Sequence, residues 1–281
     1  MLHPKQKGRF LSILILTLMV FSFALTTCSA AIIIIIIIIG GTGNALGTMR
    51  WIAEAYQKAN PEVQITVLPS IGSSGAIKAV PTGRIQIGLS ARPLKKTESK
   101  KGIVAIEYAR TPTVFAVSNK TKINAVTLSQ LVDIYDRTLK KWPDGSTIRP
   151  VIRQAGDDNT KQIKGLSLEL KKAVERAEKR TIFLFASTDQ DTVNKIENTP
   201  GSFGVTSLAL LLSEKRKMHP LMLDGVEPSI QSCIDGDYPM IKRFYFILPT
   251  KRSAQVDAFL GFVSSPKGAE ILKQNGNYPV Q

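Results

Sequence analysis

The chain has 281 residues and a formal net charge of +15 at pH 7, from 37 Lys and Arg against 22 Asp and Glu. A chain this basic attracts anions. No aromatic residues interleave with its lysine pairs, as the stacking platforms of a nucleic-acid site require, so we expect no nucleic-acid partner. The only histidines are His3 and His219, which excludes a metal site built from several histidines.

The first 31 residues are predicted to form an export signal with its processing site. Basic residues precede an uncharged apolar run at 10–25, and small residues follow it. The segment Leu25-Thr26-Thr27-Cys28 resembles a lipobox, which makes Cys28 a candidate lipidation site, although threonine is unusual directly before that cysteine. Cleavage after Ala31 is the alternative, and a retained transmembrane anchor is a third. With Cys28 lipidated or removed, Cys233 is the only cysteine left, and no internal disulfide can form.

The mature part is predicted to begin with alternating strands and helices. Eight isoleucines at 32–39 predict a strand buried on both faces, although natural buried strands mix several residue types. The turn Gly40-Gly41-Thr42-Gly43-Asn44 follows, and then apolar residues at helical spacing. A strand at 63–67, a second turn at Gly72-Ser73-Ser74-Gly75, a short helix and a third strand at 85–89 continue the pattern.

Three β-α units in this order predict an α/β fold, with a parallel sheet covered by helices and binding loops at the carboxyl ends of the strands. A small-residue turn between a strand and a helix points several backbone N–H groups at one place, and the helix dipole adds positive charge there. Two such turns, about thirty residues apart, predict that both helix starts face one anion.

The second half is predicted to form a second lobe. A strand at 113–118 begins the crossing, and Thr127 with Gln130 resembles a capping box that opens a helix. One long lysine-rich helix is expected to end near Arg180. Two short helices within 254–273 are expected to pack back on the first lobe.

About 250 residues remain after export, which suits two lobes with a core each. We assign residues 32–112 to the first lobe, 113–245 to the second lobe and 246–281 to the return to the first. Thr188 is expected to cap a further helix in the second lobe.

Enzyme motifs are not matched. The glycines after the first strand are spaced G-x-G-x-x-x-G, which departs from the dinucleotide fingerprint, and no acid follows the second strand to hold a ribose. The second glycine turn is not a G-x-S-x-G nucleophile elbow, and His219 is the only histidine outside the signal, which argues against a serine triad. We expect no enzyme activity, no cofactor and no metal site.

Six segments follow one another in an order typical of one family: Gly41-Thr42-Gly43, residues 72–78, residues 87–94, residues 204–208, residues 223–226 and residues 238–243. Together they resemble the PstS-like phosphate-binding proteins of ABC transporters, a group of periplasmic binding proteins. The resemblance implies a two-lobed fold, each lobe a mainly parallel sheet flanked by helices, with two hinge crossings and the ligand enclosed in a cleft between the lobes.

In that family, the first lobe holds phosphate through both glycine turns and the end of the third strand, and the second lobe adds an arginine and a polar loop. The resemblance therefore implies these ligand-binding residues: Thr42, Gly43, Asn44, Ala45, Leu46, Ser73, Ser74, Gly75, Ser90, Ala91, Arg92, Arg153, Asp157, Asp158, Asn159 and Thr160. N–H groups and hydroxyls suit an oxyanion, and arginine offers a planar fork of charged donors. Alternatives stay open, because Ser74 can simply cap its helix and Arg92 can form a surface ion pair.

Two departures from the family pattern bear on the ligand. Many members carry an aspartate where this chain has Ala91, and that carboxylate accepts a hydrogen bond from protonated phosphate. The second-lobe loop, usually rich in Ser, Gly and Thr, has Asp157 and Asp158 instead. We hypothesise that the proton acceptor has moved to one of these two aspartates, although helix capping alone also accounts for them.

We therefore expect an exported, monomeric solute-binding protein that captures phosphate or a similar oxyanion for the permease subunits of an ABC importer. Membrane contact is expected only through a lipid anchor. Two alternatives remain: the same fold serving another solute or acting as a ligand sensor, and a basic surface-adhesion protein.

Overall fold

The structure, a computed structural model, describes residues 34–280 of the chain, and residues from Ile35 onward form one compact unit. Its strands are β1 Ile35–Gly41, β2 Val63–Val67, β3 Ile87–Ser90, β4 Ile103–Ser118, β5 Ala125–Val126, β6 Arg149–Ile152, β7 Leu184–Phe185, β8 Ser202–Ser207, β9 Met218–Pro220, β10 Met222–Leu223, β11 Ile241–Pro249 and β12 Tyr278–Pro279. Its α-helices are α2 Gly43–Ala59, α3 Gly72–Ala79, α4 Leu128–Asp136, α5 Asp158–Leu166, α6 Leu168–Ala177, α7 Asp189–Asn198, α8 Leu208–Ser213, α9 Ile230–Asp235, α10 Ala254–Val263 and α11 Pro266–Gln274, with 3-10 turns η1 Val80–Thr82 and η2 Ser99–Lys101.

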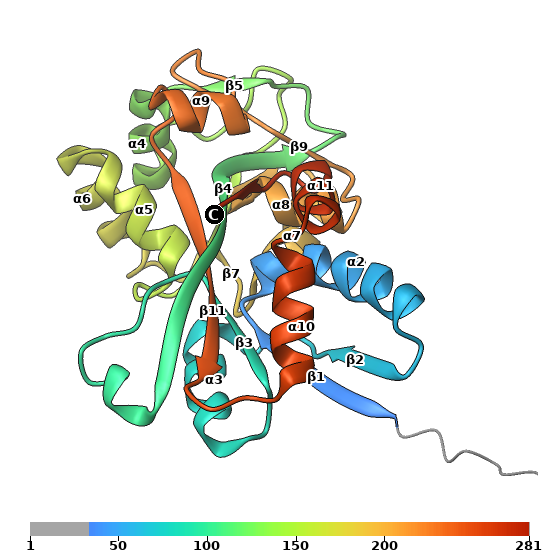
Figure 1. The fold of residues 1–281 in the computed structure, drawn as a ribbon. Coiled ribbons are helices and arrows are strands. Elements are labelled where there is room, and N and C mark those ends of the chain that lie inside the picture. The colour runs from blue at the N-terminus through green and yellow to red at the C-terminus, as the bar shows by residue number, and fades with distance from the viewer. Residues whose placement is uncertain (1–33, 281) are drawn as a thin grey trace, which may run out of the picture. The chain divides into compact units, whose positions relative to one another are not determined.

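One large sheet organises the unit, with strand order β2-β1-β3-β11-β4-β8-β6-β7. Strand β1 lies between β2 and β3 and is parallel to both, while β11 is antiparallel to β3 and to β4. Strand β6 is parallel to β7 and β8. Helices flank this sheet (Figure 1), which confirms the predicted α/β class. Among the residues described, no helix is both long and apolar enough to cross a membrane.

Strand β4 connects two hydrophobic cores. Its first part pairs with β11 and contributes Ala109 to one core, and its last part pairs with β8 and contributes Phe115 to the other. Figure 1 shows β4 running alongside β11. On β11 the chain passes back between the cores, because Met240 belongs to the second core and Phe244 to the first. The lobe boundaries given above stay a prediction.

The C-terminal helices α10 and α11 pack on the first core, as predicted, through residues such as Phe259 and Leu272. The capping box at Thr127 and the cap at Thr188 are confirmed, since each side chain accepts a hydrogen bond from the third residue of its helix. Local sequence signals therefore locate these two helix starts correctly.

Three local expectations are wrong. Strand β1 is not buried on both faces along its length, because Ile36 is 57% exposed. The lysine-rich helix is two helices, since Ser167 is extended and its side chain caps α6 instead of continuing α5. Strand β4 begins at Ile103, ten residues before the predicted start at 113, because pairing with β11 extends it.

Gly41 illustrates how tightly β1 and β3 approach. A Cβ atom added at this position would lie 2.0 Å from the carbonyl oxygen of Leu89. That oxygen belongs to the backbone and cannot rotate away. We expect Gly41→Ala to lower the free energy of unfolding by about 2–3 kcal/mol, because the strands must separate. Chemical denaturation followed by circular dichroism measures this change.

Gly165 is the matched control, since it lies exposed in helix α5 and a Cβ there meets nothing within 4 Å. Gly165→Ala is expected to stabilise by about 0.5–1 kcal/mol, as alanine does in a helix. Equal effects of the two substitutions contradict the packing argument for Gly41.

Candidate oxyanion site

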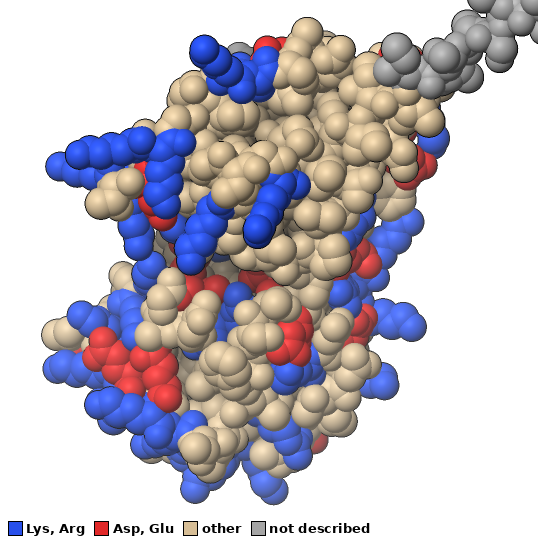
Figure 2. Space-filling view, turned by 90° about the horizontal axis from the view of Figure 1, so that it is seen from below, with Lys and Arg blue, Asp and Glu red and all other residues tan. Residues whose placement is uncertain are grey.

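A cavity of about 450 Å³ lies at the carboxyl ends of β1, β3 and β6 and at the starts of α2, α3, α5 and α7. Its lining residues are Thr42, Asn44, Ser70, Ile71, Gly72, Ser73, Ser74, Ala91, Arg92, Arg153, Gln154, Gly156, Asp157, Asp158, Asn159, Lys161, Ser187, Thr188, Asp189 and Lys242. The space-filling view shows one face of the molecule, where most charged side chains are Lys or Arg and Asp and Glu lie between them (Figure 2). The cavity thus combines residues from both halves of the chain.

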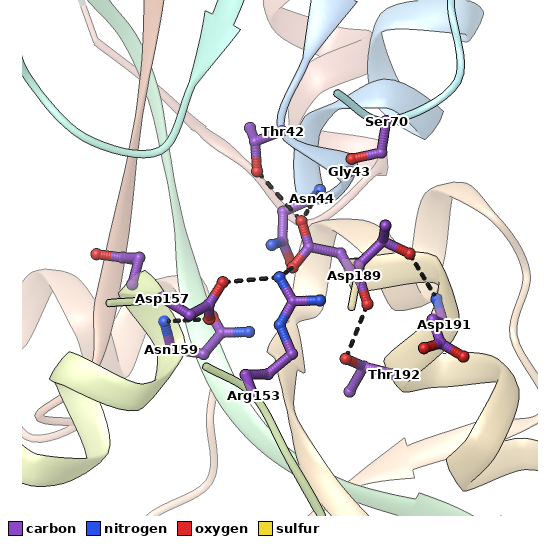
Figure 3. Close-up of polar contacts among 12 residues, drawn as sticks. Thr42, Gly43, Asn44, Ser70, Arg153, Asp157, Asn159, Asp189, Asp191 and Thr192 are labelled. Atoms are coloured by element: carbon purple, nitrogen blue, oxygen red, sulfur yellow. Dashed lines mark hydrogen bonds and ion pairs between the residues drawn. The ribbon is translucent and has the colours of Figure 1, made fainter. Parts of the chain in front are cut away.

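The start of helix α2 meets a carboxylate from helix α7. Thr42 is the N-cap residue, and its hydroxyl donates to Asp189 Oδ2 at 3.3 Å instead of capping its own helix. The backbone N–H of Asn44 donates to the same oxygen at 3.2 Å (Figure 3). This helix start therefore binds a negative group, but that group is an aspartate of the protein, and the predicted contact of the first glycine turn with a bound anion stays a prediction.

Arg153 follows strand β6 and lies between two aspartates (Figure 3). Its Nη2 atom is 2.7 Å from Asp157 Oδ2 and 3.6 Å from Asp189 Oδ1, and its side chain is 9% exposed. Burial alone lowers the pKa of Arg153, but Asp189 and Asp157 outweigh burial and raise it, so the guanidinium stays charged. Its Nε and Nη1 atoms are buried without a hydrogen-bond partner among the described residues. Arg153 thus keeps two nitrogen atoms whose N–H groups have no acceptor among the described residues.

The three aspartates of the cavity differ in their surroundings. Asp157 caps helix α5 by accepting the Asn159 N–H at 3.0 Å. Asp158 accepts a hydrogen bond from Gln162 at 2.9 Å and forms an ion pair with Lys242. Burial raises the pKa of Asp189, although the charge of Arg153 opposes this. Burial thus disfavours the charged form of Asp189, while the nearby Arg153 favours it.

The second glycine turn brings hydroxyls to the opposite wall. Ser73 Oγ accepts the Ala91 N–H at 2.9 Å. Arg92 binds both carboxylate oxygens of Glu98, at 2.8 and 2.9 Å, and also donates to Ser74 Oγ at 3.2 Å. The alternative of an ion pair for Arg92 is thus the one observed, and Glu98 neutralises its charge.

The structure brings together the predicted residues Thr42, Asn44, Ser73, Ser74, Ala91, Arg92, Arg153, Asp157, Asp158 and Asn159 at the cavity. It does not place Gly43, Ala45, Leu46, Gly75, Ser90 or Thr160 in the lining. Ala45 and Leu46 belong to the hydrophobic core. The hydroxyl of Ser90 donates to the Arg92 carbonyl. Cys28 lies outside the described residues.

Several lining residues were not predicted as ligand-binding, above all Asp189 and Lys242. The predicted cap at Thr188 put Asp189 at the start of a helix, but no local pattern indicates that this start meets α2. Lys242 belongs to one of the six resembling segments, but it was not among the residues that the resemblance implied for ligand binding. The described residues contain no group of three or more His, Cys, Asp or Glu able to hold a metal.

A family model described as the PBP superfamily domain matches residues 26–267. The phosphate-binding protein PstS 2 of Streptococcus agalactiae is 34% identical over 106 residues, which cover 38% of this chain and 36% of that protein. The chain thus matches only about a third of the length of that relative.

The phosphate-binding protein PstS of Borreliella burgdorferi is 23% identical over 272 residues, covering 94% of this chain and 97% of that protein. A crystal structure from Clostridium perfringens, with bound phosphate, of a protein assigned as a phosphate ABC transporter substrate-binding protein has a TM-score of 0.72 at 20% identity. It covers 88% of this chain and 100% of that one, which confirms the two-lobed binding-protein fold.

The Arg92–Glu98 pair predicts a pH dependence of stability. Hydrogen bonding to Arg92 lowers the pKa of Glu98 from 4.5 to about 2. A carboxylate with a lowered folded-state pKa stabilises the fold above its ordinary pKa and loses that contribution as the pH falls. We expect Glu98→Gln to lower the free energy of unfolding by about 1 kcal/mol at pH 7.

Urea unfolding should show this difference shrinking as the pH falls from 4.5 toward about 2. Glu54→Gln is the control, because its pair with Lys58 is a surface i,i+4 contact with 53% of the Glu54 side chain exposed. Its effect is expected to stay below about 0.5 kcal/mol. A pH-independent loss in Glu98→Gln contradicts the ion-pair explanation.

Proposed function

The chain belongs to the PBP superfamily, and from this we propose that it is an extracytoplasmic solute-binding protein that captures phosphate for an ABC importer. One observation carries the proposal: within residues 34–280, Nε and Nη1 of buried Arg153 have no hydrogen-bond partner, and Arg153 lines a cavity that four helix starts face. Such donors strongly favour an oxyanion. The relatives named for phosphate binding support the same ligand.

Binding would draw on both sides of the cavity. The second glycine turn offers Ser73 and Ser74 from one side, and Arg153 with the start of α5 offers charged and backbone donors from the other. Each side adds contacts only when the ligand lies between them, so the bound anion favours closure. Capture and release need no chemical step, and we propose no enzyme activity.

Ligand discrimination would depend on carboxylates. Ala91 leaves the end of β3 without the family's proton-accepting aspartate. Asp157 and Asp158 are each held by a cation, Arg153 and Lys242 respectively, while buried Asp189 has a raised pKa. We propose that one of these three aspartates, in its ionised form, accepts a hydrogen bond from protonated phosphate. A carboxylate at this place repels sulfate, which has no proton to share at neutral pH.

The remaining parts of the proposal concern the protein's place in the cell. We propose that residues 1–31 direct export, that Cys28 is acylated or the signal is cleaved after Ala31, and that the protein acts as a monomer delivering its ligand to permease subunits. The lysine-rich surface supports a second candidate, adhesion to anionic surfaces. Salt screens binding to exposed charges far more than binding at a buried site, so the salt dependence of binding separates the two candidates.

The first test removes the central cation. Isothermal titration of the wild type with phosphate should give one site, and Arg153→Met should weaken it at least about 100-fold, because several charge-assisted hydrogen bonds are lost. Arg149→Met is the control: it lies four residues earlier, is exposed, and donates to the Pro200 carbonyl at 2.7 Å, away from the cavity. The absence of phosphate binding in the wild type refutes the proposed ligand.

The second test locates the proton acceptor. Asn replaces Asp157, Asp158 and Asp189 in turn, and each variant is titrated with phosphate and sulfate. In one of the variants, we expect the ratio of the dissociation constants for sulfate and phosphate to fall at least about tenfold, because an amide no longer repels sulfate. Asp191→Asn is the control on the same helix as Asp189, because Asp191 pairs with Lys195 and does not line the cavity. Tight sulfate binding by the wild type contradicts the idea.

A further inference from the structure

Lys242 is a buried cation whose amine lies at the cavity. It is the second residue of β11 and pairs with Thr111 of β4 in the sheet. Its side chain is only 1% exposed, and its Nζ atom forms an ion pair with Asp158 Oδ2. Lysine is almost never buried unless it is paired. A lysine buried at this position therefore needs acceptors for its charged amine.

The pair with Asp158 satisfies only part of the hydrogen-bonding capacity of Lys242. Asp158 is 33% exposed and also accepts the Gln162 amide, so water and Gln162 already solvate it. An ammonium group has three N–H donors. Within the described residues, the side chain of Lys242 donates a hydrogen bond to Asp158. Two donors remain for a further acceptor at the cavity.

The charge balance of the cavity points to the same need. The lining carries the cations Arg92, Arg153, Lys161 and Lys242 and the carboxylates Asp157, Asp158 and Asp189. Glu98 neutralises Arg92, and Lys161 is exposed. Arg153 alone faces two carboxylates. Arg153 and Lys242 thus face three aspartates, and without Lys242 the excess of negative charge around an entering oxyanion would be larger still.

We infer that Lys242 is a ligand-binding residue. Its ammonium group donates two hydrogen bonds to the captured oxyanion, while its third N–H group stays bound to Asp158. This inference rests on the proposed function and adds a residue to the same site. The amine is fixed by a sheet strand between the two cores, so it offers a rigid contact that the loops on either side can close upon. The expected ligand is a small oxyanion with two or more acceptor oxygens free for Lys242 and Arg153.

The test is a double-mutant cycle measured by titration with inorganic phosphate. Lys242→Met is expected to bind at least tenfold more weakly than the wild type. Lys251→Met is the control, because it removes the same charge from an exposed position just beyond the end of β11. Circular dichroism and melting temperature establish that each variant is folded.

The Asp158→Asn background separates direct contact from mere neutralisation. If Lys242 touches the oxyanion, Lys242→Met still costs at least tenfold when Asp158 is already Asn. The inference is overturned if Lys242→Met binds like the wild type, or if its cost disappears in that background. A wild type that binds no phosphate overturns the proposed function instead, so the two failures are distinct. Should Lys242→Met not fold, Lys242→Gln in the Asp158→Asn background answers the same question.

Discussion

A buried arginine between two aspartates is the interaction on which the site depends. Arg153 contacts Asp157 at the start of α5 and Asp189 at the start of α7, and Asp189 in turn accepts donors from the start of α2. Removing one partner from such a group leaves an uncompensated charge in a poorly solvated place, which costs several kcal/mol. These contacts link three helix starts that are distant in sequence.

The parts of this arrangement that local chemistry dictates could be predicted from the sequence. The glycine turns, the caps at Thr127 and Thr188, and the order of strands and helices all depend on residues within a few positions of each other. Asp189 could not be predicted as a site residue, because its partner Thr42 is 147 residues away. The break at Ser167 was missed for another reason: a serine within a helical pattern carries no sign of whether it continues one helix or caps the next.

The overall charge and the local charge of this protein serve different ends. A net charge of +15 draws anions of every kind toward the molecule. The cavity itself pairs nearly every cation with a carboxylate, so the attraction is largely cancelled at the place of binding. Selectivity among anions at the cavity must come from the arrangement of its hydrogen-bond donors and from a carboxylate that accepts a hydrogen bond from a protonated anion. Electrostatic attraction alone would admit any anion.

Strand β4 contains a proline at the point where its pairing partner changes. It runs without interruption through both cores, and Pro112 stands where its partner changes from β11 to β8. Proline has no amide hydrogen, so the ladder already lacks a donor at that residue. A twist of one core against the other would therefore break few backbone bonds if it were concentrated there. A hinge at Pro112 would thus lie within a strand, at a residue that has no backbone donor to lose.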